Sequence, residues 1–180
     1  MSDAHDLQPV PDLHPEIGRL LAMLDDNTVE WRRELAEIDV PQDAIGWRPF
    51  PKGYNIGAVM FHIAEAEIFW LHDIAAGQPM GEDWQRTFMV EAIDQYEFDW
   101  PTPPDEPLDW FYEQLDGVRA KTRELIGAIN DPEHVCQRGD RSFTLRWVLH
   151  HVIQHEAHHG GQITLLGMAH KHRRNAEGSS

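Results

Sequence analysis

Residues 108–129, LDWFYEQLDGVRAKTRELIGAI, carry the clearest helical pattern in the chain. Side chains of one face recur there at alternating spacings of three and four residues, which is the period of an amphipathic α-helix. That face consists of Leu108, Phe111, Leu115, Val118, Thr122, Leu125 and Ile129. The pattern ends before Asp131 and Pro132, where a helix cannot easily continue. We therefore predict a long helix that buries one face against other helices.

Three further segments show the same period, and strand signals are almost absent. The predicted helices cover residues 15–38, 55–77 and 142–170. Pro15 suits the first position of a helix, and Asn55 is a good N-cap for the second. Gly77 suits the end of the second helix, and either Ser142 or Thr144 can cap the start of the last one.

Long helices with one apolar stripe each pack most economically as a four-helix bundle, so we predict an all-α fold. Pro101, Pro103, Pro104 and Pro107 exclude a continuous helix over residues 78–107, and we predict a long crossover there with room for one short helix. The expected organisation is a flexible segment over residues 1–14, one bundle domain over 15–170 and a disordered tail over 171–180.

The charge of the chain excludes nucleic acid as an expected partner. Lys and Arg number 15 against 31 Asp and Glu, a formal net charge of −16, and the basic run Lys171–Arg174 lies in the tail. No apolar run reaches the ~20 residues that span a bilayer, and the first residues lack the apolar stretch of a secretory signal. Cys136 has no second cysteine to pair with. We expect a cytoplasmic protein with no membrane partner.

Histidine is the unusual residue of this composition. The chain has 12 histidines, and seven of them lie between His150 and His172. At ~100° per residue, one face of the last helix carries a seam that points into the bundle. That seam consists of Val148, Val152, His155, His159, Gln162 and Leu166. Polar side chains on a core face are costly unless something pairs with them.

Histidines at i and i+4 on one helical face can coordinate a single metal ion. His155 and His159 have this spacing, and His62 lies in the middle of the corresponding seam of the second helix. That seam consists of Val59, His62, Ala66, Phe69 and Asp73. A bundle can place the three imidazoles together, which would leave an open, catalytic type of metal site that lowers the pKa of a bound water or thiol. The alternative to a metal site is that the pair on the last helix is solvated and that His62 is a hydrogen-bonded core residue.

Four neighbouring residues are candidates for orienting the imidazoles or lining a substrate pocket, and no catalytic residue is assigned. They are Glu65, Glu156, His158 and Gln162. For Glu65 and Glu156, an equally good interpretation is that each is a solvated residue on the helix surface.

Residues 149–163, LHHVIQHEAHHGGQI, resemble the last-helix motif of the DinB/YfiT-like superfamily, and residues 56–67 resemble the stretch that supplies its first ligand. The resemblance covers roughly residues 15–170. It implies a bundle, often dimeric, in which His62, His155 and His159 hold a divalent metal such as zinc or nickel. One departure is Gly160, where members commonly have Arg. We expect either extra room beside the metal or a local bend there.

The resemblance implies a transferase that joins a low-molecular-weight thiol, of the bacillithiol, mycothiol or glutathione class, to a small-molecule electrophile. A non-catalytic metal-binding module is the first alternative. The second is a hydrolase or peptidase, because residues 155–159 read H-E-x-x-H. The extended protease pattern fails, since Gln162 and Leu165 stand where it requires Gly and His.

Overall fold

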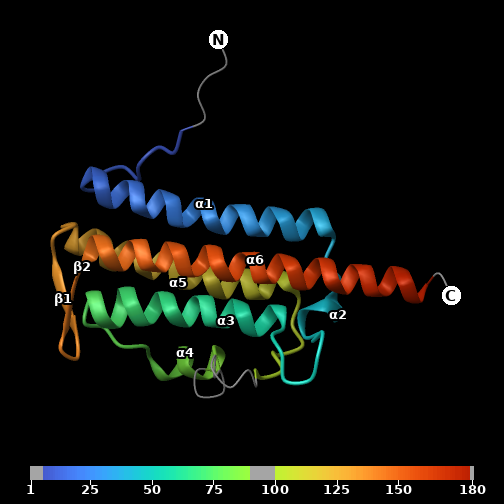
Figure 1. The fold of residues 1–180 in the computed structure, drawn as a ribbon. Helices are drawn as coiled ribbons and strands as arrows, with labels where there is room; N and C mark the ends of the chain where they lie inside the picture. Colours follow the sequence, from blue (N-terminus) through green and yellow to red (C-terminus); the bar gives the residue numbers. More distant parts are fainter. Residues whose placement is uncertain (1–5, 90–99, 179–180) are drawn as a thin grey trace, which may run out of the picture.

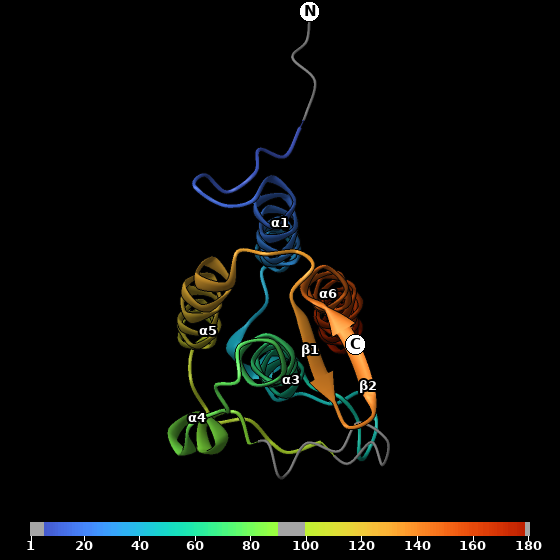
Figure 2. The same cartoon turned by 90° about the vertical axis from the view of Figure 1, so that its left-hand side faces the viewer.

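The computed structural model describes residues 6–89 and 100–178. Within them the chain is mostly helical, with one small two-stranded sheet. The long helices are α1 (Pro15–Ile38), α3 (Ile56–Glu67) with its π-helical continuation η1 (Ile68–Ala75), α5 (Leu108–Ile129) and α6 (Leu145–Glu177). They lie side by side in Figure 1 and are seen end-on in Figure 2. The prediction of a mainly helical chain is confirmed.

The helix starts follow from local capping. The Asn55 side chain accepts a hydrogen bond from the Ala58 backbone N–H at 2.8 Å and so caps α3. Of the two residues considered for α6, Thr144 is the cap, and its hydroxyl accepts from the Trp147 N–H at 3.3 Å. Because these caps satisfy backbone donors that have no partner within the helix, they determine where the two histidine-bearing helices begin.

A hairpin that we did not predict lies before α6. Strands β1 (Val135–Arg138) and β2 (Arg141–Thr144) pair antiparallel, and Gly139 in the turn has a φ of +61°. Four-residue strands are too short to show a clear alternation of apolar and polar residues. β1 packs on η1 and β2 on α6, so the hairpin covers one end of these two helices.

Two short helices complete the described part of the fold. α2 (Gln42–Ile45) was not predicted, and α4 (Glu82–Thr87) lies in the predicted crossover, alongside α3 in Figure 1. Residues 90–99 of that crossover fall outside the described residues. No helix of the described residues is long and apolar enough to cross a membrane.

The last helix is longer than predicted, whereas the flexibility of residues 1–14 stays a prediction. α6 continues through Glu177, although we expected a disordered tail from residue 171. Lys171 Nζ donates to the Ile38 carbonyl at 2.6 Å, and Arg173 pairs with Glu177 at 3.0 Å, contacts that a search for apolar periodicity does not detect. Residues 6–14 form no helix or strand, but the Val10 N–H donates to the Gly18 carbonyl at 3.0 Å.

The core has two apolar halves with a polar layer between them. One half contains Phe61, Phe111 and Ile163, and the other contains Leu21 and Leu149. Near the boundary between the two sets, each long helix carries buried or half-buried polar side chains. These are Asp25 and Thr28 on α1, Glu67 on α3, Arg119 and Thr122 on α5, and His155, Glu156 and His159 on α6. The helices therefore meet in polar contacts at mid-length.

Asn55→Ala should lower the free energy of unfolding by about 2 kcal/mol, because Asn55 is fully buried and its amide also donates to the Pro101 carbonyl at 2.9 Å. Thr144→Ala, which removes a cap alone, should cost about 1 kcal/mol. Urea unfolding of both variants measures this difference. Equal losses would show that the bond to Pro101 contributes nothing.

Candidate metal centre

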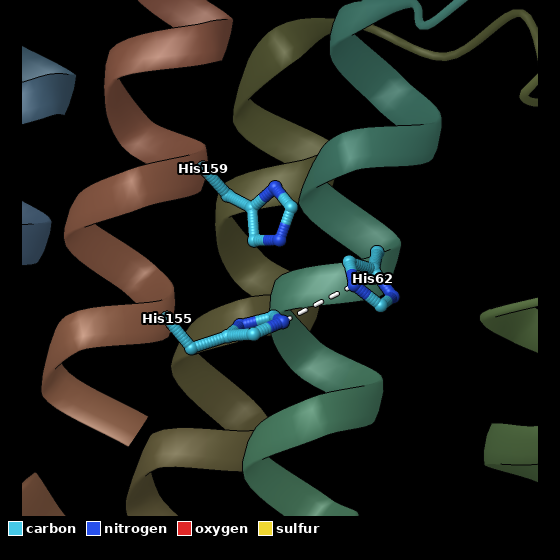
Figure 3. Close-up of side chains that lie close together, drawn as sticks. All are labelled: His62, His155 and His159. Atoms are coloured by element: carbon cyan, nitrogen blue, oxygen red, sulfur yellow. Dashed lines mark hydrogen bonds between the residues drawn. The ribbon is translucent and has the colours of Figure 1, made fainter. Parts of the chain in front are cut away.

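Three histidines converge between α3 and α6. Figure 3 shows His155 and His159 projecting from successive turns of α6 toward His62 on α3. One ring nitrogen from each lies within 4.8 Å of the others, and the Nε2 atoms of His155 and His62 are 3.1 Å apart. Among the described residues, this is the group of side chains that can hold a metal ion. Their role as ligands stays a prediction.

Two of the rings are held in the tautomer that metal binding requires. His62 Nδ1 lies 3.2 Å from Glu65 Oε2, and His159 Nδ1 lies 2.7 Å from Gln162 Oε1. An oxygen accepts in each case, so Nδ1 carries the hydrogen and Nε2 keeps its lone pair for the centre. The structure thus places Glu65 and Gln162 where a metal site needs orienting partners.

The protonation of the α6 histidines also suits a metal. Burial, and after it the neighbouring imidazoles with His159 foremost, lower the pKa of His155 to about 2. Burial lowers the pKa of His159 to about 4, against the hydrogen bond to Gln162, which raises it. Both rings are therefore neutral near pH 7, which is the form that binds metals.

A cavity of about 480 Å³ opens beside the histidines, a size that fits a small molecule. Its lining consists of His62, Glu65, Ala66, Phe69, Trp70, Arg138, His151 and His155. Sequence reasoning did not identify the aromatic pair or Arg138 as site residues. Phe69 and Trp70 lie in the π-helix, and Arg138 lies on the unpredicted hairpin.

The two remaining candidates, His158 and Glu156, do not hold the three converging imidazoles in place. His158 is exposed and contacts Gln162 Nε2 at 3.2 Å, so it lies at the edge of the site. Glu156 is buried, and its carboxylate accepts from Thr28, from Trp31 Nε1 at 3.1 Å and from Arg119 at 2.7 Å. Since partners on α1 and α5 hold this carboxylate, it is not placed as the general base of an H-E-x-x-H hydrolase.

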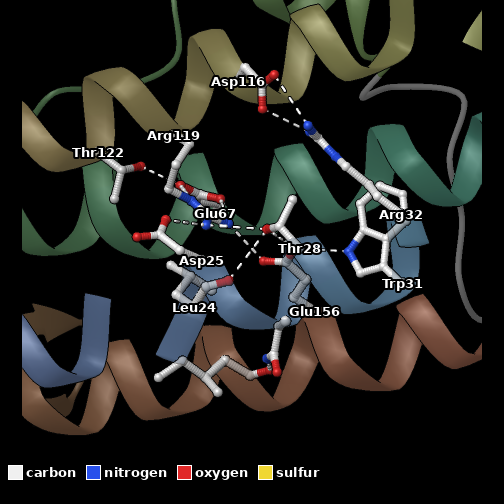
Figure 4. Close-up of polar contacts among 12 residues, drawn as sticks. Leu24, Asp25, Thr28, Trp31, Arg32, Glu67, Asp116, Arg119, Thr122 and Glu156 are labelled. Carbon is white, nitrogen blue, oxygen red and sulfur yellow. Dashed lines mark hydrogen bonds and ion pairs between the residues drawn. The ribbon is translucent and has the colours of Figure 1, made fainter. Parts of the chain in front are cut away.

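Arg119 of α5 joins the two helices that carry the histidines (Figure 4). It donates to Glu67 of α3 at 2.9 and 3.0 Å and to Glu156 of α6 at 2.7 Å. Glu67 and Glu156 are almost inaccessible, at 3% and 1% exposure. Burial raises the pKa of Glu156, whereas the positive charge of Arg119 lowers it. The Thr122 hydroxyl donates to Glu67 at 2.6 Å and accepts from His72 Nε2 at 2.8 Å. The network therefore fixes α3 against α6.

Gly160 lies on the side of α6 that faces α1. A Cβ atom built there would lie 2.9 Å from Trp31 Cδ1, which is closer than real Cβ atoms approach a neighbour. Glycine therefore allows α6 to pack directly on Trp31, and the arginine that the resemblance to the superfamily leads one to expect here would clash with that ring. The close approach to Trp31 gives a reason for glycine at this position, and the bend stays a prediction.

In the metal-free protein, the imidazole signals of His155 and His159 should not titrate between pH 8 and 5, whereas those of the urea-unfolded chain should titrate near 6.5. The unfolded chain then binds protons that the folded chain does not, so stability should fall as the pH drops from about 6.5 toward 4. NMR titration and urea unfolding at pH 7 and 5 measure both effects. Signals that titrate near 6.5 in the folded protein would contradict this.

Arg119→Met should cost about 3–5 kcal/mol of stability, because it leaves two buried carboxylates without their partner. Arg123→Met, one turn further along α5, removes a half-exposed pair with Asp25 and should cost less than about 1 kcal/mol. Urea unfolding of the two variants gives the comparison. Equal costs would mean that Arg119 contributes no more than a surface pair.

Comparison with protein families gives a match, and comparison with curated proteins gives none. The family model described as mycothiol-S-transferase matches residues 19–169, which include all three converging histidines. This confirms the relationship to the DinB-like superfamily, of which that family is a part. The chain belongs to the mycothiol-S-transferase family.

Proposed function

We propose that the protein is a metal-dependent thiol S-transferase. In this proposal His62, His155 and His159 hold one divalent ion, and a low-molecular-weight thiol is activated there for attack on a small-molecule electrophile. The observation that carries the proposal is the convergence of three ring nitrogens, two of them in rings whose Nδ1 atoms are engaged by Glu65 and Gln162. The family match supports a thiol as the co-substrate.

The donor set fits a metal of the zinc or nickel type. Imidazole nitrogen suits both ions, and three protein ligands leave a coordination position for a substrate. In a tetrahedral zinc site, nitrogen ligands lie about 3.3 Å apart, which is close to the 3.1 Å between His62 and His155. When bound, such an ion lowers the pKa of a thiol and keeps it as the nucleophilic thiolate.

The surrounding residues prepare the site for two substrates. Glu65 and Gln162 hold the rings of His62 and His159 in one orientation, so little reorganisation is needed when a ligand arrives. The cavity lies against His62 and His155, and Phe69 and Trp70 give it an apolar wall. That wall suits the carbon skeleton of an electrophile, and it limits the access of water to the reacting sulfur.

The proposal extends to the bundle fold, the oligomeric state and the location of the protein. We propose that α1, α3 with η1, α5 and α6 form a DinB-like four-helix bundle over residues 15–170 that acts as a homodimer in the cytoplasm. The side-by-side packing in Figures 1 and 2 supports the bundle. Homodimerisation rests on the resemblance to the superfamily, and sedimentation velocity would test it.

Protein purified without added metal should contain about one zinc or nickel ion per chain by elemental analysis. His62→Ala and His155→Ala should each reduce this content at least about tenfold, since losing a ligand should cost no less than losing a partner that orients it. His172→Ala, on the exposed end of α6, is the matched control and should retain the metal. The metal claim fails if wild type and variants contain the same negligible amount.

Conjugation of monochlorobimane to bacillithiol, mycothiol or glutathione should be accelerated by the wild-type protein. The acceleration should be lost on chelation, restored by the metal, and absent in His155→Ala. If no thiol gives metal-dependent conjugation while the protein still binds metal, a non-catalytic metal-binding module becomes the better account.

A further inference from the structure

A histidine outside the converging group lines the cavity beside that group. His151 is half-buried, lies one helical turn before His155, and lines the cavity together with His62. Its ring stacks on Trp147, with centroids 5.0 Å apart and an interplanar angle of 10°, and it meets the ring of Trp70 edge-on at 4.9 Å. The two indoles therefore hold this imidazole at one place in the cavity wall.

The ring nitrogens of His151 have no task in the chemistry described so far. Within residues 6–89 and 100–178, no hydrogen bond engages either nitrogen, whereas the Nδ1 atoms of His62 and His159 are engaged by their partners. His151 also lies outside the group whose ring nitrogens approach within 4.8 Å of one another, so it is not placed as a fourth ligand. A neutral imidazole in this state has a lone pair that can accept a proton.

The surroundings keep His151 neutral near pH 7. Burial lowers the pKa of His151, and the charges of His150 and Arg138 lower it further. The neutral form is the one that accepts a proton, and histidine does so most often in catalysis near neutral pH. The other titratable groups that share the cavity come from α3 and α6, and they are His62, Glu65 and His155.

The proposed reaction needs a proton acceptor in this cavity. A free thiol has a pKa of about 8.5, so only a few per cent of it is thiolate at pH 7. The other side chains of the lining offer no comparable acceptor. Two are imidazoles of the converging group, one is a carboxylate engaged by such an imidazole, one is a guanidinium and three are apolar. In that order they are His62 and His155, Glu65, Arg138, and Ala66, Phe69 and Trp70.

We infer that His151 is the general base that removes the proton of the thiol substrate. The S–H bond breaks, its electron pair stays on sulfur, and the proton moves to a ring nitrogen of His151. The sulfur then forms a bond to the electrophilic carbon, the leaving group departs with its bonding electron pair, and His151 returns the proton to solvent. This inference rests on the proposed function, because it assumes that a thiol reacts in this cavity.

The pH dependence of conjugation by the metal-loaded protein tests the inference, with mycothiol and monochlorobimane as substrates. In wild type, kcat/KM should change less than about twofold between pH 7 and 8, where the base is neutral and the thiol is protonated. His151→Gln can use only thiolate already formed in solution. It should therefore lose about thirtyfold at pH 7 and regain about tenfold per pH unit.

His150→Gln is the matched control for this comparison. His150 is the neighbouring histidine, but its side chain is exposed and does not line the cavity. This variant should keep the wild-type rate and the wild-type profile above pH 7.

Two further measurements separate proton transfer from a structural role of the ring. Without an electrophile, the ultraviolet absorbance of the thiolate should appear more slowly when mycothiol is mixed with metal-loaded His151→Gln than with wild type, at equal metal content. His151→Ala leaves a gap beside Trp147 and Trp70, and added imidazole should restore its conjugation activity.

A flat pH profile in His151→Gln, an unchanged rate of thiolate formation, or an equal loss in His150→Gln would each overturn the inference. Loss of the metal in His151→Gln would identify the residue as a ligand and overturn it as well. Metal-dependent conjugation that is equal in wild type and His151→Gln refutes the base alone. If wild type shows no metal-dependent conjugation, the proposed function fails, and the assignment of His151 fails with it.

Discussion

The buried guanidinium of Arg119 is the constraint on which the centre of the molecule depends. Two carboxylates from different helices, Glu67 and Glu156, are almost inaccessible to water, and one cation pairs with both. Buried charges are tolerated only when they are paired and hydrogen-bonded. Because Glu156 directly follows His155, an interaction on one side of α6 fixes the position of a ring on the other side.

The same layer explains why histidines can occupy the core. The long helices meet in apolar contacts on either side of it, and these contacts hold the polar groups at a fixed level. Within the layer each buried polar group has a specific partner: Thr122 for His72, Gln162 for His159 and Glu65 for His62. A fully satisfied polar layer permits one register of the helices, so it specifies the arrangement as well as stabilising it.

Helical periodicity was enough to predict the long helices and the three histidines that converge, because each helix buries one stripe over several turns. Helical periodicity was a less reliable guide beyond Glu67, because the π-helix that begins there does not follow the ~3.6-residue period of an α-helix. Phe69 and Asp73, predicted on the core seam, are only half-buried there. The direction of Glu156 could not be predicted either, since its partners Thr28, Trp31 and Arg119 come from distant segments.

The hairpin of β1 and β2 has a consequence for how such a protein can change over evolutionary time. It contributes Arg138 to the lining of the cavity from outside the helices that carry the histidines and the Arg119 network. A substitution in a short exposed ribbon can alter which molecules fit without disturbing the buried layer that holds the rings. Under the proposed function, the residues that select a substrate and the residues that hold the centre are therefore separable by mutation, and one scaffold can acquire new specificities in single steps.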